Sequence, residues 1–146
     1  MTLRRWTLSL LFLLCGSALA AGPLLLGRPG TGAGLLLAFA VLAALHSPLP
    51  FPAPLDAHEA QRRSAADGRP VVFWRPGCKY CLRLRFRLGR DAARVHWVDI
   101  WRDPRAAAVV RAANGGDETV PTVVVAGRAH TNPSVEWVRG QLSRAE

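Results

Sequence analysis

Two cysteines separated by two residues, Cys78 and Cys81, are the side chains in this chain whose types and spacing best suit chemistry. They follow the apolar run 71–74, which is typical of a short buried strand. When a strand leads into a Cys-x-x-Cys motif that opens a helix, the unpaired N–H groups of the first helical turn stabilise the thiolate of the first cysteine. This arrangement predicts a site for thiol-disulfide exchange at residues 78–81.

Three side chains next to the cysteines are candidates for binding a substrate. Arg75 and Lys79 carry positive charge, which favours the charged form of a nearby thiol. Tyr80 lies between the two cysteines, and we expect it to shape access to the sulfur atoms. The alternative for Tyr80 is a packing role.

A zinc site is the alternative chemistry for the same two cysteines. A closed structural site takes four ligands, so two more would have to come from His96, His130 or a second chain. Neither histidine has paired ligand spacing, and no metal is expected here. The third cysteine, Cys15, lies in an apolar segment, where it is expected to be an inert small residue.

Strands and helices are expected to alternate around the cysteines. The expected elements begin with a strand at 70–74, a helix that Cys78 caps and that ends at Gly89 and Arg90, a strand at 94–100 and a helix at 103–113. A strand at 119–126, a short strand after the turn at 127–128, and a last helix that starts at 132–133 or at Ser134 and runs through Leu142 follow. Because a helix joins the first two strands, these strands are expected to be parallel. The fold class is therefore a three-layer α/β domain.

Residues 82–88 show two conflicting periodicities. Apolar side chains alternate with arginine, as they do in a strand. On a helical wheel, however, the apolar side chains from Cys81 to Leu88, Phe86 included, share a broad arc, and only Arg85 is misplaced. We predict a helix, because the chemistry of the cysteines needs a helix N-terminus.

The first 52 residues carry almost no charge beyond three arginines and form the expected membrane anchor. Two transmembrane helices are expected at about residues 6–26 and 31–51, since roughly 20 apolar residues cross a hydrocarbon core. The apolar centre of the second segment, 34–45, is short and has to borrow residues from either side. The basic start of the first segment also fits a cleavable signal peptide.

The positions of the arginines favour a hairpin with both ends in the cytoplasm. Only Arg28 lies between the two apolar segments, whereas Arg62, Arg63, Arg69 and Arg75 follow the second one. We therefore expect a protein of the cell membrane with two spans and a redox domain that faces the cytoplasm. If the second segment does not span, the alternative is an exported thiol oxidoreductase.

A proline-rich stretch separates the anchor from the soluble part. Prolines at positions 48, 50, 52 and 54 make a stiff exit from the membrane. Residues 53–68 are expected to form a juxtamembrane linker helix, with Asp56 as its N-cap and Gly68 beyond its end. The redox domain is then expected at residues 69–146.

The net charge of +9 and the pI near 11.3 raise the question of nucleic-acid binding. No nucleic-acid motif accompanies this charge, and arginine also accumulates on the cytoplasmic side of membrane proteins. Membrane lipid is the expected partner, and nucleic acid is not.

The soluble part resembles the glutaredoxin branch of the thioredoxin fold over residues 69–145. Within that branch it looks like the mycoredoxins, the glutaredoxin-like proteins of bacteria that use mycothiol as their main low-molecular-weight thiol. Three motifs carry this closer resemblance: Asp-Ile-Trp-Arg-Asp-Pro at 99–104, Asn-Gly-Gly-Asp-Glu-Thr-Val-Pro at 114–121, and Thr-Asn-Pro at 131–133. The resemblance implies a thioredoxin-like domain, here preceded by a transmembrane helical hairpin.

The resemblance also implies roles for single residues. Cys78 is similar to the nucleophilic cysteine of the family, and Cys81 is similar to the resolving cysteine. Thr119, Val120 and Pro121 resemble the loop whose cis-proline presents its backbone to the sulfurs, and an X-Pro bond has only a small cis penalty. The implied protein is a thiol-disulfide oxidoreductase with no bound cofactor.

Mycothiol is the implied co-substrate, and mixed disulfides between mycothiol and proteins are the implied substrates, with membrane proteins as a hypothesis for the clients. Glutathione-dependent glutaredoxins carry an acid that meets the amine of glutathione, and this chain has none at 127–132. Mycothiol has an acetylated, neutral nitrogen instead. The hydroxyl of Thr131 and the amide of Asn132 can donate and accept hydrogen bonds without a charge, so they suit this group. Both residues can also cap the last helix.

Overall fold

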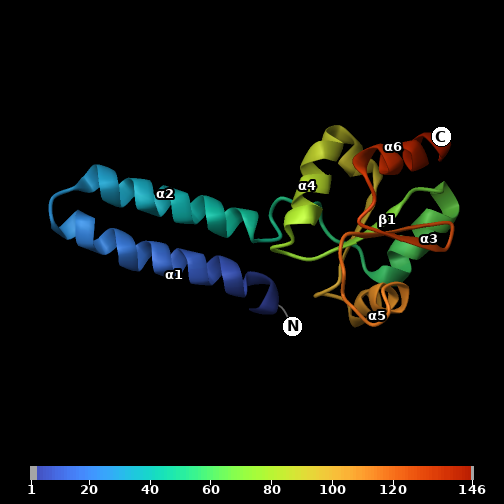
Figure 1. Ribbon diagram of the computed structural model, residues 1–146, viewed down its shortest axis with the longest axis horizontal. Coiled ribbons are helices and arrows are strands. Elements are labelled where there is room, and N and C mark those ends of the chain that lie inside the picture. Colours follow the sequence, from blue (N-terminus) through green and yellow to red (C-terminus); the bar gives the residue numbers. More distant parts are fainter. Residues whose placement is uncertain (1–2, 146) are drawn as a thin grey trace. The chain divides into compact units, whose positions relative to one another are not determined.

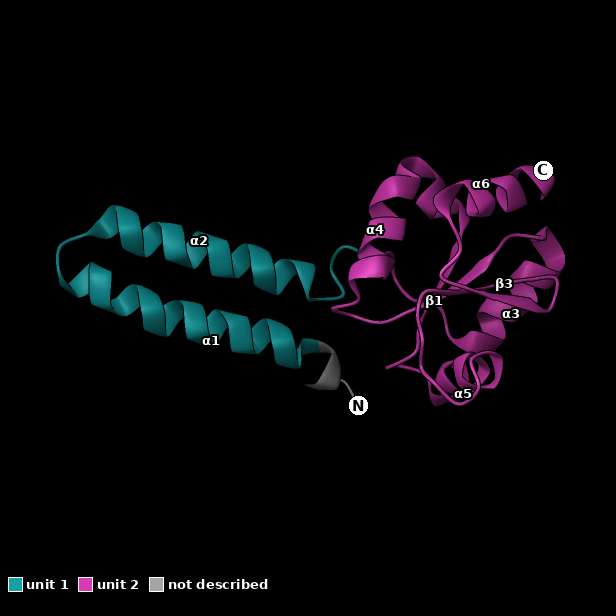
Figure 2. Ribbon diagram, in the orientation of Figure 1, with its two compact units in different colours: residues 1–50 teal, residues 51–146 magenta. Residues whose placement is uncertain are grey.

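The computed structural model describes residues 3–145, with side chains from Trp6 onward. The chain divides into two compact units, residues 1–50 and 51–146 (Figure 2). The first unit is a pair of helices. The second is an α/β domain that carries the Cys-x-x-Cys motif.

Two apolar helices, α1 (Leu3–Leu25) and α2 (Pro29–Leu45), make up the first unit. They lie side by side along their length (Figure 1). Glycine allows this close approach, because a Cβ atom on Gly16 would lie 2.4 Å from the Cβ of Phe39. Packing through small residues is typical of helix pairs in membranes.

The two helices differ in length. Among the described residues, one helix, Trp6–Leu25, is long and apolar enough to cross a membrane. The second helix has 17 residues and ends at Leu45, whereas we expected the second span to reach residue 51. It ends early because the prolines at 48 and 50 cannot continue a helix, and because the Oγ of Ser47 donates to a carbonyl of the last turn at 2.7 Å.

Four strands form the sheet of the second unit: β1 (Val71–Trp74), β2 (His96–Asp99), β3 (Thr122–Val125) and β4 (Arg128–Thr131). Their order across the sheet is β2-β1-β3-β4. Strand β1 is parallel to β2, as expected, and the other two neighbouring pairs are antiparallel.

Helices cover both faces of this sheet (Figure 1). On one face lie α4 (Lys79–Leu88) and α6 (Val135–Arg144), and on the other lie α3 (Ala57–Asp67) and α5 (Pro104–Ala113). A 3₁₀ helix, η1 (Gly89–Arg94), follows α4. The three-layer α/β arrangement expected from the sequence is confirmed.

Capping residues set the ends of the helices. Asp56 caps α3 and Gly68 closes it with a φ of 70°. Pro104 is the first residue of α5, and the Oγ of Ser134 accepts the hydrogen bond that caps α6. The strands are shorter than predicted, since β3 begins only after Pro121.

Helix α3 is part of the domain, whereas the sequence led us to expect a linker. Ala57 and Ala60 are buried, and the ring of Phe51 stacks on Trp74 with 3.7 Å between the ring centroids. The N–H of Leu55 donates to a carbonyl of β2 at 3.0 Å. The packing of α3 on the sheet was not predicted, because its buried face consists of alanines, which contribute little to an apolar sequence pattern.

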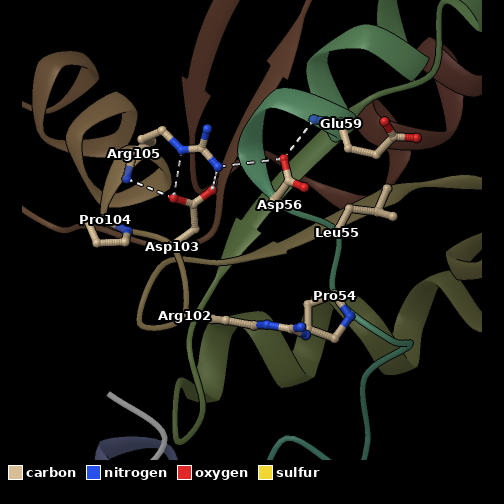
Figure 3. Close-up of a pocket in the computed structure, with 8 residues that line it drawn as sticks. All are labelled: Pro54, Leu55, Asp56, Glu59, Arg102, Asp103, Pro104 and Arg105. Carbon is tan, nitrogen blue, oxygen red and sulfur yellow. Dashed lines mark hydrogen bonds and ion pairs between the residues drawn. The ribbon is translucent and has the colours of Figure 1, made fainter.

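The carboxylate of Asp103 ties α3 to α5, and Figure 3 shows it beside Arg105, which also reaches Asp56 at the start of α3. The Oδ2 of Asp103 accepts from the N–H of Ala57 at 2.8 Å, and its Oδ1 accepts from the N–H of Arg105 at 3.0 Å. Burial raises the pKa of Asp103, but these hydrogen bonds and the guanidinium of Arg105 outweigh it, so the pKa is lowered. The hollow beside these residues has a volume of 670 Å³, and its charged groups serve to hold the helices together.

One side chain of α4 lies on the opposite face from the one predicted. Phe86 is 60% exposed, although we placed it in the buried arc. The buried arc is centred on Cys81, Leu84 and Leu88, and at roughly 100° per residue Phe86 lies about 140° from Cys81. Arg85 instead is half-buried, with its Nη1 donating to the carbonyl of Gly89 at 3.4 Å.

Candidate active site

Cys78 is the N-cap of α4. Its Sγ accepts a hydrogen bond from the N–H of Cys81 at 3.2 Å, so the sulfur faces the unpaired donors of the first helical turn. When protonated, the same Sγ donates to the carbonyl of Val120 at 3.4 Å. Cys81 is buried, and both cysteines are free thiols.

The two thiols have opposite tendencies to ionise. A hydrogen bond from the Cys81 thiol, then the N–H groups of Cys81 and Tyr80 and the charge of Arg75, lower the pKa of Cys78 to about 7 against the opposing effect of burial. Burial raises the pKa of Cys81, and the neighbouring Cys78 raises it further. Near neutral pH, Cys78 is therefore the more readily ionised of the two thiols, whereas Cys81 stays protonated.

A groove opens beside Cys78. Its volume is 580 Å³, and its lining includes the expected residues Arg75, Lys79, Tyr80, Thr119 and Val120. The Nζ of Lys79 lies 5.0 Å from the centroid of the Tyr80 ring. Lys79 is not among the groups that lower the pKa of Cys78. The thiol of Cys81 and the N–H groups at the helix N-terminus produce most of the lowering, part of which we had expected from Lys79.

The peptide bond between Val120 and Pro121 is cis, as the sequence predicted. The carbonyl of Pro121 accepts from the N–H of Asn132 at 2.7 Å, which fastens the loop to the residue after β4. The backbone of this loop thus faces Cys78 through the carbonyl of Val120.

Thr131 and Asn132 lie outside the groove. Asn132 lines a smaller hollow of 200 Å³ that shares Tyr80 with the groove, and it adopts a left-handed φ of 47°. The hydroxyl of Thr131 donates to the Oδ1 of Asn114, so its proton is already engaged. Of this pair, Asn132 is the residue placed next to a candidate binding surface.

Comparison with known proteins identifies the domain. The family model described as Glutaredoxin matches residues 71–130. Two proteins of Mycobacterium tuberculosis, from strains CDC 1551 and H37Rv, whose names assign them provisionally to the glutaredoxins, are 44% identical to this chain over 73 residues. The matches span 49% of this chain and 87% of each relative. The chain belongs to the glutaredoxin family. It is a thiol-disulfide oxidoreductase, and its substrates are thiols and protein disulfides.

Two residues of this glutaredoxin's groove were missed by the sequence analysis. Asp117 and Glu118 line it together with Lys79 and Tyr80. The carboxylate of Glu118 pairs with Arg111 at 2.7 Å. Both acids directly precede Thr119, so their place in the same loop was the available signal. The groove is therefore lined by both signs of charge.

Metal ligands do not gather in the described part of this glutaredoxin. No group of three or more His, Cys, Asp or Glu side chains among residues 3–145 is placed to hold a metal ion. His96 is buried in β2 and its Nε2 lies 2.9 Å from the Oδ2 of Asp67.

The pH dependence of alkylation tests the ionisation of Cys78. In a Cys15→Ser background, we expect the rate of reaction with iodoacetamide to rise about tenfold per pH unit and to level off above a midpoint near 7, because the thiolate is the reactive form. Mass spectrometry of proteolytic peptides measures the rate at each cysteine. Cys81 should stay unlabelled over this range, and a midpoint near that of an ordinary free thiol would contradict the assignment.

Proposed function

We propose that this glutaredoxin reduces mixed disulfides between proteins and mycothiol through Cys78 and Cys81, while α1 and α2 hold it in a membrane with the redox domain in the cytoplasm. The observation that carries the chemical part is the placement of Cys78, which caps α4 at an open groove and has its pKa lowered to about 7. Membership of the glutaredoxin family indicates the class of reaction, and the positions of Cys78 and Cys81 suggest its steps.

The reaction begins when the Cys78 thiolate attacks the mycothiol sulfur of a protein-mycothiol disulfide. A disulfide forms between Cys78 and mycothiol as the old one breaks, and the protein thiolate leaves and takes up a proton. A second mycothiol thiolate then attacks the bound mycothiol, so that mycothiol disulfide leaves and the Cys78 thiolate returns. Cys81 offers a slower second route through an internal disulfide, since its raised pKa keeps it protonated.

The preference for mycothiol is supported by the motifs at 99–104, 114–121 and 131–133 and by the neutral amide of Asn132 beside Tyr80. Asp117 and Glu118 qualify that support, because a groove acid can pair with the amine of glutathione. Glu118 already pairs with Arg111, which leaves Asp117 as the acid to test.

Reduction of the oxidised domain by each thiol tests this preference. We expect mycothiol to react faster than glutathione at matched thiolate concentration, and Asn132→Asp to move the ratio toward glutathione by about tenfold, the effect of one charge-assisted hydrogen bond. Asp117→Asn tests the remaining groove acid: an unchanged ratio is expected if Asp117 does not pair with the amine of glutathione, and a shift toward mycothiol would show that it does. Equal rates with the two thiols in the wild type would leave only a general glutaredoxin activity.

The membrane anchor is supported by the apolar helix Trp6–Leu25, by the apolar side chains that cover α2, and by glycine packing between the two helices. The 17 residues of α2 rise about 26 Å, slightly less than a typical hydrocarbon core of about 30 Å, so this helix crosses with local thinning of the bilayer. The excess of arginine after α2 supports the cytoplasmic orientation.

Reporter fusions test the topology. Alkaline phosphatase, which is active only after export, is expected to be inactive when fused after Glu146 and active when fused in the turn after Gly27. Green fluorescent protein should give the reverse pattern at the same two sites. An active phosphatase at residue 146 would place the domain outside the cytoplasm and favour the exported oxidoreductase.

A further inference from the structure

The exposed face of α4 and η1 combines positive charge with aromatic side chains. Lys79, Arg83, Phe86 and Arg87 are exposed and recur at the spacing of one face of α4, and the exposed Arg90 follows in η1 after the break at Gly89. The opposite face is fixed to the core by the buried Cys81, Leu84 and Leu88. The cationic side chains are therefore held outward by the packing of the helix.

This face is strongly positive. In the part of the chain that the structure describes, no carboxylate forms an ion pair with Lys79, Arg83, Arg87 or Arg90, and α4 itself contains no acid. Two acids lie at the edge. Glu136 lines the same hollow as Arg83 and Arg87, and Asp91 pairs with Arg94 and Arg139. Glu136 also interacts electrostatically with Arg87, so the face keeps a net positive charge that is reduced at one edge and otherwise available to an external partner.

Phe86 decides which kind of partner fits. Its side chain is 60% exposed among the arginines, and Tyr80, 46% exposed, lies near the start of the same helix. A lipid surface takes up such a ring between headgroups while the surrounding arginines meet phosphates, as in amphipathic helices that lie in the interface.

We propose that the face formed by Lys79, Tyr80, Arg83, Phe86, Arg87 and Arg90 docks the redox domain on an anionic lipid surface. The inference rests on the proposed membrane anchor, which keeps the domain near lipid. Lys79 and Tyr80 also line the groove beside Cys78, so docking places the reactive sulfur at the edge of the membrane surface. Protein disulfides close to the bilayer are then the ones presented to it.

A fluorescent probe on the full chain in lipid nanodiscs tests docking. With all three native cysteines changed to Ser, Ala93→Cys carries the probe, because this exposed residue lies one 3₁₀ turn beyond Arg90. We expect lipid-linked quencher to quench the probe at least twofold more in discs that contain phosphatidylglycerol than in discs of phosphatidylcholine alone. A probe at Ala112→Cys, exposed on α5 across the sheet, should not respond.

Charge removal is the second arm. Changing Arg83, Arg87 and Arg90 to Gln should lower the docking constant by about a hundredfold, since each arginine near an anionic surface is worth about fivefold. The matched control removes the same charge elsewhere, at Arg62, Arg63 and Arg102, and should leave the quenching unchanged. Phe86→Ser should weaken docking without altering its salt dependence. All these side chains except that of Phe86 are exposed arginines, and thermal unfolding checks that each variant is folded.

The outcomes separate the docking from the anchor. A chain that fails to enter the discs would overturn the anchor, and the docking with it. A chain that enters both kinds of disc, with the same Ala93 quenching in each, would overturn the docking alone. If the triple Gln variant keeps its lipid response but reduces an acidic mixed-disulfide protein more slowly, the face serves a protein partner and the docking is overturned.

Discussion

Changing Cys78 to Ser is expected to lower the rate of reduction of a protein-mycothiol disulfide by roughly a thousandfold or more, because a serine hydroxyl stays protonated near neutral pH and forms no mixed disulfide. Cys81 is expected to be dispensable for the monothiol route. It still affects the rate, since its thiol gives the hydrogen bond that contributes most to the lowered pKa of Cys78.

Two replacements of Cys81 separate this effect from nucleophilic catalysis. Cys81→Ser keeps a hydrogen-bond donor, whereas Cys81→Ala removes it and should let the pKa of Cys78 rise toward that of a free thiol. At pH 7 we expect the rates to fall in the order wild type, Ser and Ala, with about a tenfold loss for Ala. At pH 9 the differences should nearly disappear. Equal loss in Cys78→Ser and Cys81→Ser would exclude the monothiol route.

Phe51→Ala is expected to lower the free energy of unfolding of the redox domain by about 3–5 kcal/mol, the usual effect of emptying a buried phenylalanine site. Phe51 is 8% exposed and stacks on Trp74, so its removal leaves a cavity beside the sheet. Phe86→Ala makes the same chemical change at an exposed site and is the control, with an expected effect within about 0.5 kcal/mol.

Denaturant unfolding in detergent micelles, followed through the fluorescence of the buried Trp74 and Trp97, measures both variants. If Phe51→Ala and Phe86→Ala had the same small effect, residues 51–68 would behave as the linker that the sequence suggested. A large effect of Phe51→Ala alone establishes that the domain begins at Phe51 in energetic terms as well as in its contacts.

Helix ends were predictable because their signals are local. Asp56 with Gly68, and Asp103 with Pro104, specify the ends of α3 and the start of α5 through bonds within one turn. The cis bond before Pro121 also followed from its immediate sequence and the family resemblance. For these features the residues that make the interaction are neighbours in the chain.

The features that escaped prediction depend on residues far apart in the chain. The burial of α3 depends on the contact of Ala57 with Asp103. Its buried side chains are alanines, which give too weak an apolar pattern to predict a buried helix face. Phe86 lies outward because the core selects the arc of α4 around Leu84 and Leu88. Thr131 is engaged by Asn114 from another element, which a motif at 131–133 cannot reveal.

Few residues connect the last residue of α2 to the first core residue of the domain, and this limits how far the domain can move from the two helices. Helix α2 ends at Leu45 and Phe51 is already packed on Trp74, so the connection consists of residues 46–50, of which Ser47 is hydrogen-bonded to the last turn of α2. Five residues span at most about 18 Å when fully extended. With α1 and α2 in a bilayer as we propose, a protein that diffuses in the cytoplasm must reach the membrane surface before this glutaredoxin can reduce its disulfide. Cysteines of neighbouring membrane proteins that lie close to the bilayer surface, in contrast, always remain in the layer that the domain can reach.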